Sequence, residues 1–441
     1  MSGSDEAQRA SANPGRTAAG PDARQPDSRL QIGALLLGIA LLVLGTGLAG
    51  TLVGVRAGLE NMGSQTIGVI MSAYFVGYVA SSLLVPRLVN EVGHIRTFAA
   101  LASIASAVSL AFAIFVSPLT WIVLRAIHGA CFAGLLIVTE SWLNIATERN
   151  SRGRVLAIYG IVVYGAWAAS QPLLSLSPPS GFVLFCLVSI CLSLALVPIT
   201  LMRAVGPGVV EVRRASIRRL FTISPVAIVG AFAVGLVTSA FFGMAPTFAQ
   251  RIGMDDGEIA AFLGVTLTGA LLLQWPMGWL SDYVDRRLVI LGAALGICVS
   301  ALGLAWNTDG GMTSLLLLSF SLGAFALPTY SLCLAHANDD VDAEEVVSVS
   351  SGLILVFGLG STMGPFTASL VMGAMGPAGL FLFIAVVAIV LALYDISGLM
   401  AMPKTADSRK ATFVAMPQTS HAATRLHKRR TEKDSGRVAP R

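Results

Sequence analysis

The chain has 441 residues, of which 55% are hydrophobic and only 12% are charged. Soluble domains are about a quarter charged, so this composition excludes an ordinary soluble protein. The net charge of +5 comes without basic patches interleaved with stacking aromatics, and nucleic-acid binding is therefore not expected.

The first half of the chain begins with residues 1–29, which are polar and are expected to form a disordered cytoplasmic tail. The apolar run that follows is too long for a cleaved signal peptide and predicts a membrane helix. A span needs roughly 20 apolar residues. On this rule a first six-helix bundle is expected over 30–202, with spans at about 30–54, 65–86, 96–116, 118–140, 154–175 and 181–202.

The second half repeats this arrangement after a polar cytoplasmic linker at 203–222. A second six-helix bundle is expected over 223–399, with spans at about 223–248, 258–280, 287–306, 312–335, 347–371 and 377–399. The basic segment 400–441 is too polar to bury a core and predicts a disordered cytoplasmic tail.

The distribution of Lys and Arg indicates the orientation. With the N-terminus taken as cytoplasmic, 26 of the 29 Lys and Arg residues fall in the tails and loops on that side. Arg56 and Arg251 lie on the opposite side, and Arg125 lies within a span. Positive charge is retained on the cytoplasmic side of a membrane, so both termini are predicted to be cytoplasmic.

An internal repeat relates the two halves. The segment from Pro86 to Arg96 aligns with the segment from Gly278 to Arg287, so that Leu88 matches Leu280. Likewise Tyr164-Gly165 precedes Pro172 at the spacing with which Phe357-Gly358 precedes Pro365. Parallel six-helix repeats place a transport site between the two halves at the bilayer midplane.

The second copy of the first repeat carries a charged motif, Gly278-Trp-Leu-Ser-Asp282-Tyr-Val-Asp285-Arg286-Arg287. It resembles the major facilitator superfamily signature G-x-L-[AS]-D-x-x-G-[RK]-[RK], with Asp285 in place of a glycine. The resemblance implies a cytoplasmic latch in which an acid at a helix end pairs with Arg. A plain charged turn with a solvated Asp282 is the alternative.

Two further segments belong to this cytoplasmic region. In the first half Pro86, Asn90 and His94 replace the glycine, the acid and a base of the motif, so a weaker latch is expected there. Glu140 and Arg154 bound the next cytoplasmic loop. They are expected to take part in gating or to form a simple loop ion pair.

Arg125 is the basic residue placed within a span, where a charge costs at least ~2.5–3.5 kcal/mol. The string Arg125-Ala-Ile-His128-Gly129 resembles the family motif R-x-x-[polar]-G, which implies an Arg facing the cavity and linked to proton coupling. Arg125 and His128 share a helix face. A structural Arg bonded to backbone carbonyls and a packing His are the alternatives.

The segments around Gln274-Trp275-Pro276, Phe242-Gly243 and Gly364-Pro365 resemble the YcaD-type branch of the superfamily. The resemblance covers about 30–400 and implies an all-α membrane protein with the major facilitator fold, built from 12 transmembrane helices as two six-helix halves. It implies a secondary transporter of small molecules in contact with membrane lipids. It also implies a bacterial inner (plasma) membrane. We expect a monomer that is driven either by a gradient of protons as the coupling ion or by a gradient of another solute.

Other classes of protein are disfavoured by what the sequence lacks. It has no Walker A motif and no metal-ligand or Ser/His/Asp cluster at one membrane depth, so no enzyme, cofactor or metal is expected. The five cysteines lie in apolar runs and are expected to be buried. A proton-coupled exporter of drugs or metabolites and a non-transporting membrane sensor or scaffold remain as alternatives. The exporter is disfavoured because the first span has no acid and the fifth lacks the full antiporter motif.

Helical spacing predicts an aromatic substrate cavity. Tyr164, Trp167 and Gln171 share one face of the fifth span, and Tyr74 and Tyr78 share a face of the second. The full predicted cavity set is Arg125, His128, Tyr74, Tyr78, Tyr164, Trp167, Gln171, Phe241, Gln274, Trp275, Tyr330 and Phe357. Such a cavity suits a planar, mostly neutral solute with polar edges. Some facilitators import riboflavin, and uptake of a vitamin of this kind is our leading hypothesis. Simple helix packing by these residues is the alternative.

Overall fold

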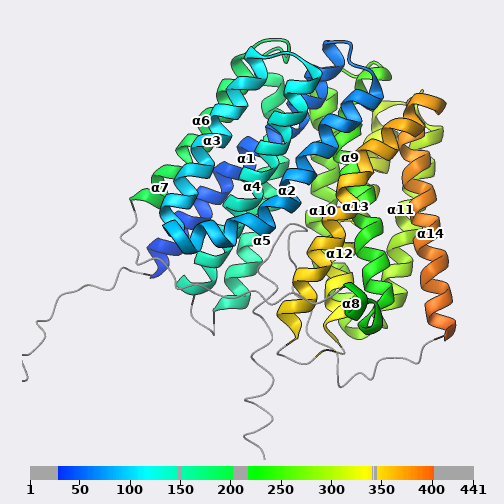
Figure 1. Cartoon of the computed structure of the whole chain (residues 1–441). Coiled ribbons are helices and arrows are strands. Elements are labelled where there is room, and N and C mark those ends of the chain that lie inside the picture. The colour runs from blue at the N-terminus through cyan, green and yellow to red at the C-terminus, as the bar shows by residue number, and fades with distance from the viewer. Residues whose placement is uncertain (1–27, 148–150, 202–216, 340, 342–344, 402–441) are drawn as a thin grey trace, which may run out of the picture.

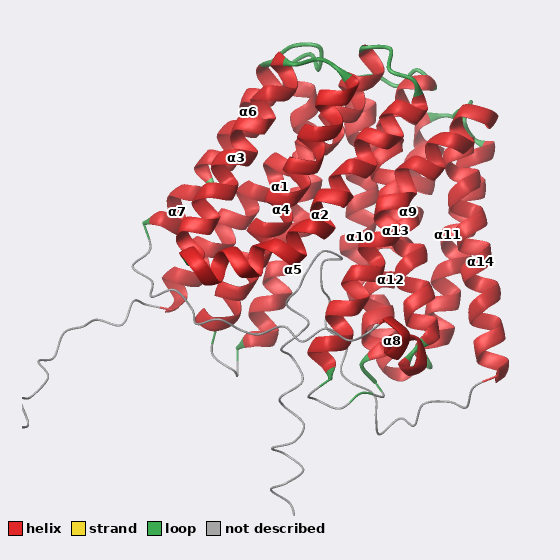
Figure 2. Ribbon diagram, viewed as in Figure 1, coloured by secondary structure: helices red, strands yellow, loops and turns green. Residues whose placement is uncertain are grey.

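The structure is a computed structural model, and it describes residues 28–147, 151–201, 217–339, 341 and 345–401. Every regular element in these ranges is a helix (Figure 2). These ranges contain 12 helices that are long and apolar enough to cross a membrane, which confirms the predicted number. Both predicted tails and most of the predicted linker lie outside the described residues.

The helical architecture follows from the solvent. Lipid offers no hydrogen bonds to backbone groups, so a chain that crosses the bilayer must satisfy them within itself. The first half consists of α1 (Ser28–Leu59), α2 (Ser64–Val92), α3 (His94–Ile114), α4 (Pro118–Ala146), α5 (Arg152–Ser170), the 3₁₀ helix η1 (Gln171–Leu176), α6 (Val183–Leu194) and α7 (Leu196–Thr200).

The short helix α8 (Ile217–Ile223) lies at the end of the predicted linker. The second half follows it and consists of α9 (Pro225–Arg251), α10 (Asp256–Tyr283), α11 (Arg286–Trp306), α12 (Met312–Ala337), α13 (Val346–Met375) and α14 (Gly379–Ala401).

Two spans that the sequence predicts as continuous helices are divided by proline. Pro172 has no N–H group, so α5 gives way to η1, and Gln171 donates its backbone N–H to the carbonyl of Ala168. In the sixth span, Pro198 cannot donate to the carbonyl of Leu194, and the span is divided there into α6 and α7. Each divided span remains long enough to cross the membrane.

Glycines bring two pairs of helices into backbone contact. A Cβ atom at Gly77 would overlap the carbonyl oxygen of Ala126, and one at Gly129 would overlap that of Tyr74, so α2 and α4 pack without intervening side chains. In the second half, Gly269 and Gly323 make the same kind of contact between α10 and α12. The two halves therefore repeat the same kind of contact between helices.

The two halves lie side by side, with α1 to α7 on the left and α9 to α14 on the right of Figure 1. The end of the molecule at which α1 begins and α14 ends, the lower end in Figure 1, is called the tail end below. Toward the opposite end the halves are in contact. Gln250 on α9 donates to the carbonyl of Val55 on α1 at 2.9 Å, and the N–H of Phe366 on α13 donates to Ser72 on α2 at 3.1 Å.

We predict that the tail end is cytoplasmic, because 26 of the 29 basic residues belong to that side. Reporter fusions at the C-terminus should be active as cytoplasmic reporters. Fusions in the loops after Arg56 and Arg251 should behave as periplasmic ones. A periplasmic C-terminal reporter would contradict the predicted topology.

Candidate functional site

A cavity of about 130 Å³ lies between the two halves. Four helices of the first half (α1, α2, α4 and α5) and two of the second (α9 and α13) form its wall. The lining residues are Val43, Thr46, Gly47, Gly50, Thr51, Met71, Tyr74, Phe75, Arg125, Phe132, Val163, Tyr164, Trp167, Thr238, Ser239, Phe242, Gly243 and Phe357.

Arg125 is the charged residue in this wall, and its side chain is almost fully buried. Its guanidinium lies over the ring of Tyr74, with 4.7 Å from Cζ to the ring centroid, and Nη2 donates to the sulfur of Met71 at 3.3 Å. Nε and Nη1 have no hydrogen-bond partner in the described part of the chain. The predicted alternative, in which Arg125 bonds to backbone carbonyls, does not occur among the described residues. Two strong donors are thus held at the cavity without an acceptor.

Aromatic rings from both halves meet in the cavity wall. The ring centroids of Trp167 on α5 and Phe242 on α9 are 4.5 Å apart. Tyr164 on α5 and Phe357 on α13, which the internal repeat relates to each other, both line the cavity. One pair of lining residues therefore occupies equivalent positions in the two halves.

Seven of the twelve predicted cavity residues do not line this cavity: Tyr78, His128, Gln171, Phe241, Gln274, Trp275 and Tyr330. Most are buried in helix contacts next to it. Gln171 accepts a hydrogen bond from the lining residue Thr51 at 2.8 Å, Gln274 donates to Ser331 at 3.2 Å, and Tyr330 packs against Phe357.

Trp275 and Phe241 show why spacing alone misplaces residues. The side chain of Trp275 is 72% exposed on the outer surface, where an apolar ring meets lipid at little cost. Phe241 is buried among other rings of the second half, and its neighbour Phe242 faces the cavity instead. His128 is buried beside Tyr74, with 6.1 Å between the ring centroids.

The lining also contains residues that were not predicted, notably Phe75, Phe132, Phe242 and the hydroxyl residues Thr46, Thr51 and Ser239. The small residues of the first span could have indicated from the sequence that this helix borders the cavity. Gly47 and Gly50 both border the cavity, and a Cβ atom at Gly47 would collide with the side chains of Trp167 and Ser170.

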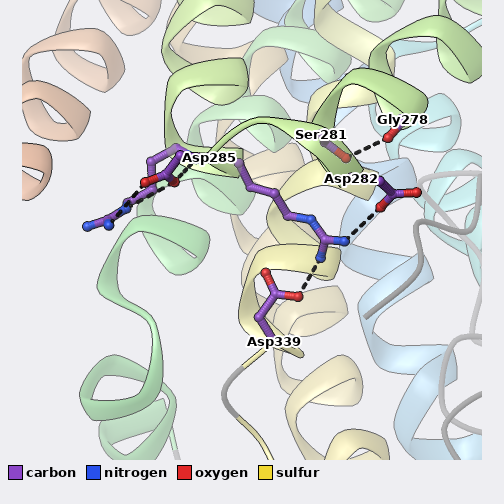
Figure 3. A network of polar contacts seen from close by, with 7 residues as sticks. Gly278, Ser281, Asp282, Asp285 and Asp339 are labelled. Carbon is purple, nitrogen blue, oxygen red and sulfur yellow. Dashed lines mark hydrogen bonds and ion pairs between the residues drawn. The ribbon is translucent and has the colours of Figure 1, made fainter. Parts of the chain in front are cut away.

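At the tail end the predicted latch residues form a charge network (Figure 3). Arg286 donates from Nη2 to Asp282 at 3.0 Å and from Nη1 to Asp339 at 2.7 Å. Arg286 and Asp339 are both buried, whereas the Asp282 side chain is 30% exposed. Asp339, which follows α12, was not predicted. Within α10, the Ser281 hydroxyl donates to the carbonyl of Gly278 at 2.7 Å.

The second arginine of the motif has its own acid. Asp285 caps α11 and accepts hydrogen bonds from the backbone N–H and the side chain of Arg287. Burial opposes ionisation of Asp285, but these hydrogen bonds and the charges of Arg287 and His336 hold its pKa below the usual value. The aspartate that replaces the motif glycine is therefore an ionised partner of Arg287.

The equivalent region of the first half has a different construction. Asn90 is exposed, and His94 is buried beside Ser141 and Trp142. Glu140 is also buried and accepts a hydrogen bond from Tyr159 at 2.5 Å. Arg154 is exposed. Tyr159 on α5 is therefore one partner of Glu140, and the predicted loop ion pair stays a prediction.

We predict that Arg286→Ala lowers the melting temperature of the purified protein far more than Arg287→Ala. The first change breaks a buried ion pair, that of Arg286 with Asp339, at a cost on the order of 3–5 kcal/mol. The second releases Asp285, which is 15% exposed and can be hydrated. The two arginines are adjacent in sequence, so each variant serves as the control for the other. Equal melting temperatures would show that the buried network does not stabilise the fold.

Comparison with known proteins places this architecture in a family. The sequence profile of the Major Facilitator Superfamily matches residues 35–274 and 227–429. The chain is 28% identical over 361 residues to the uncharacterized MFS-type transporter YcaD of Salmonella newport, and this alignment covers 81% of the chain and 92% of YcaD.

Solved structures agree in fold. The nucleoside transporter NupG superposes with a TM-score of 0.72 at 12% identity, covering 85% of this chain and all (100%) of NupG. The E. coli fucose:proton symporter FucP superposes with a TM-score of 0.54 at 15% identity, covering 83% and 99% of the two chains. These relatives are transporters and not enzymes. The chain belongs to the Major Facilitator Superfamily, in the YcaD-like branch, and is a multi-pass transporter of the bacterial inner membrane.

Proposed function

We propose that this transporter moves a small, planar, mostly neutral organic solute with polar edges by alternating access. The observation that supports this is the composition of the central cavity. Aromatic rings from both halves line it, and Arg125 is the one charged residue among its lining residues.

The aromatic part of the wall suits a flat ring system. Trp167 and Phe242 come from opposite halves, and Tyr74 and Phe132 lie close together on the neighbouring wall, with 6.4 Å between their ring centroids. A planar solute gains both apolar burial and ring stacking from such surfaces. A sugar gains less from them, because its hydroxyl groups need more polar partners than this wall supplies.

The polar part of the wall suits a ring with acceptor atoms along one edge. Nε and Nη1 of Arg125 are donors without a partner in the described part of the chain. Thr46, Thr238 and Ser239 line the same cavity, and each donates its hydroxyl to a carbonyl of its own helix. Their oxygens can still accept hydrogen bonds from a solute.

Riboflavin fits this chemical description, because its isoalloxazine ring is planar and carries carbonyl acceptors along one edge. The nucleoside transporter NupG, whose name specifies a solute that also joins a flat base to polar groups, shares the fold. The cavity of about 130 Å³ is smaller than the roughly 300–1,000 Å³ of typical ligand pockets. A tricyclic ring therefore requires a more open conformation than this one.

We infer that the present conformation is closed toward the periplasm. The contacts Gln250 to Val55 and Phe366 to Ser72 join the halves on that side in our predicted orientation. Rocking of the halves about the cavity would separate these contacts and open the site outward. We propose a proton gradient as the energy source, as the name of the fucose:proton symporter states for that relative of the same fold.

We predict that expression of the protein rescues a riboflavin auxotroph at low external vitamin, and that Trp167→Ala removes the rescue. The substitution deletes the ring that faces Phe242 across the cavity. Growth rate at limiting riboflavin is the measurement. Trp275→Ala is the matched control, because it removes a tryptophan from the outer surface and should preserve the rescue.

Two other outcomes of this experiment would change the proposed function. If the membrane-inserted protein gives no rescue, riboflavin uptake is wrong, although the family membership stands. If it instead lowers cellular accumulation of planar solutes, the proton-coupled exporter is favoured.

We also predict that Arg125→Ala reduces gradient-driven accumulation of riboflavin in energised vesicles by roughly tenfold or more. A hydrogen bond from a charged donor contributes about 1.5–3 kcal/mol, and 1.4 kcal/mol corresponds to a tenfold change in binding. Arg56→Ala, which disrupts an ion pair with Glu60 away from the cavity, is the control. Normal accumulation by the Arg125 variant would assign this residue a structural role.

A further inference from the structure

A buried carboxyl group lies away from the cavity, on the last membrane helix. Asp395 on α14 is fully buried, and neither carboxylate oxygen has a hydrogen-bond partner in the described part of the chain. It lies within the last turns of the span Gly379–Leu399, toward the tail end. Ionisable residues inside membrane spans are expensive and generally serve ion or substrate pathways.

Among the described residues, no positively charged group forms an ion pair with Asp395. α14 packs against α11, α9 and α13. Close to Asp395, the thiol of Cys333 on α12 fills the space left by Gly230 on α9. Leu391, one turn before Asp395 on the same face of α14, borders the same point. Cys333 is close enough to Asp395 for a direct electrostatic interaction.

The other titratable groups on the packed helices are accounted for. At the start of α11, Arg286 and Arg287 are each held by aspartates of the latch. The sequence of α9 contains no titratable residue before Arg251 at its far end, and the sequence of α13 contains none. Glu345, which precedes α13, pairs with Arg219. The remaining groups on α11, α12 and α14 are Cys298, Tyr330, Cys333, His336 and Tyr394.

These surroundings identify the ligand that the carboxyl group can take. An ionised carboxylate buried without a partner is strongly disfavoured. A metal ion would need several oxygen ligands, whereas the neighbours here are a thiol and apolar side chains. A proton satisfies the carboxyl group without any further ligand.

The site is connected to the cavity through two helices. α9 carries Thr238 and Ser239, which line the cavity. On α12, Tyr330 lies one turn before Cys333 and packs against the lining residue Phe357, with 5.0 Å between the ring centroids. A change in how α9, α12 and α14 pack around Asp395 would therefore reach the solute site directly.

We propose that Asp395 is a proton-binding site of the transport cycle and carries its proton in the conformation described here. When the tail ends of α9, α12 and α14 separate, the carboxyl O–H bond breaks, the proton passes to cytoplasmic water, and the hydrated carboxylate remains. The proposal rests on membership of the transporter family and on the predicted orientation, and it does not depend on which solute is carried.

Infrared spectroscopy of the full-length protein reconstituted in lipid tests this directly, without a solute. The wild type should show the C=O stretching band of a protonated carboxylic acid near neutral pH, and the band should weaken as the pH is raised. Asp395→Asn should lose this band. Glu91→Gln, which changes an exposed acid at the tail end, should keep it.

Two results would overturn the proposal. A band that is unchanged in Asp395→Asn would show that another acid holds the proton, and Glu140→Gln would test the buried acid beside Tyr159. A band that Asp395→Asn removes but that does not respond to pH would exclude proton exchange.

Thermal melting provides a second measurement that does not depend on the band. Asparagine resembles the protonated side chain and cannot ionise, so Asp395→Asn should fold. The variant should also keep its melting temperature at high pH better than the wild type. An Asp395→Asn protein that cannot be purified folded, while Asp395→Glu can, would show that the carboxylate itself is needed and would contradict the proposal.

Discussion

The close contact between α2 and α4 determines where the chemistry of the cavity lies. Because Gly77 and Gly129 have no side chains, the two helices meet backbone to backbone, and the carbonyl of Tyr74 lies against Gly129. Arg125 stands one turn before Gly129, so its guanidinium is brought over the ring of Tyr74. A larger residue at either glycine would separate the helices and remove the surface on which the charge rests.

The buried charged groups of this protein are compensated in three different ways, and each way indicates a different role. Arg286 pairs with two carboxylates through its two Nη atoms, as expected of a structural network. Arg125 has only a ring face and a sulfur atom, which stabilise its charge but leave donors for a solute. Asp395 has no hydrogen-bond partner among the described residues, and in our proposal a bound proton neutralises it. In our proposals, structure, recognition and coupling thus use separate ionisable groups.

The sequence predicted the fold well because a chain in hydrocarbon must form long apolar helices with its charged residues between them. It predicted the site less well, since a span is apolar on every side. Trp275 faces lipid, Phe241 faces other helices and Phe242 faces the cavity, yet nothing in their local sequence separates these environments. Asp339 was missed for another reason, because its pairing with Arg286 joins α11 to the end of α12 and depends on the tertiary fold.

The two halves share their packing but not their chemistry. The glycine contacts of α2 with α4 recur between α10 and α12, and on this alignment the position of Arg125 corresponds to Ser319, a buried residue that bonds only to backbone carbonyls. In the opposite sense, the latch acid Asp282 corresponds to the exposed Asn90. The cavity charge therefore belongs to the first half, while the latch and Asp395 belong to the second. Since the halves move against each other during alternating access, we infer that solute binding acts mainly on the first half and proton binding on the second. Their coupling must then pass through the contacts between the halves, such as those of Trp167 with Phe242 at the cavity and of Phe366 with Ser72.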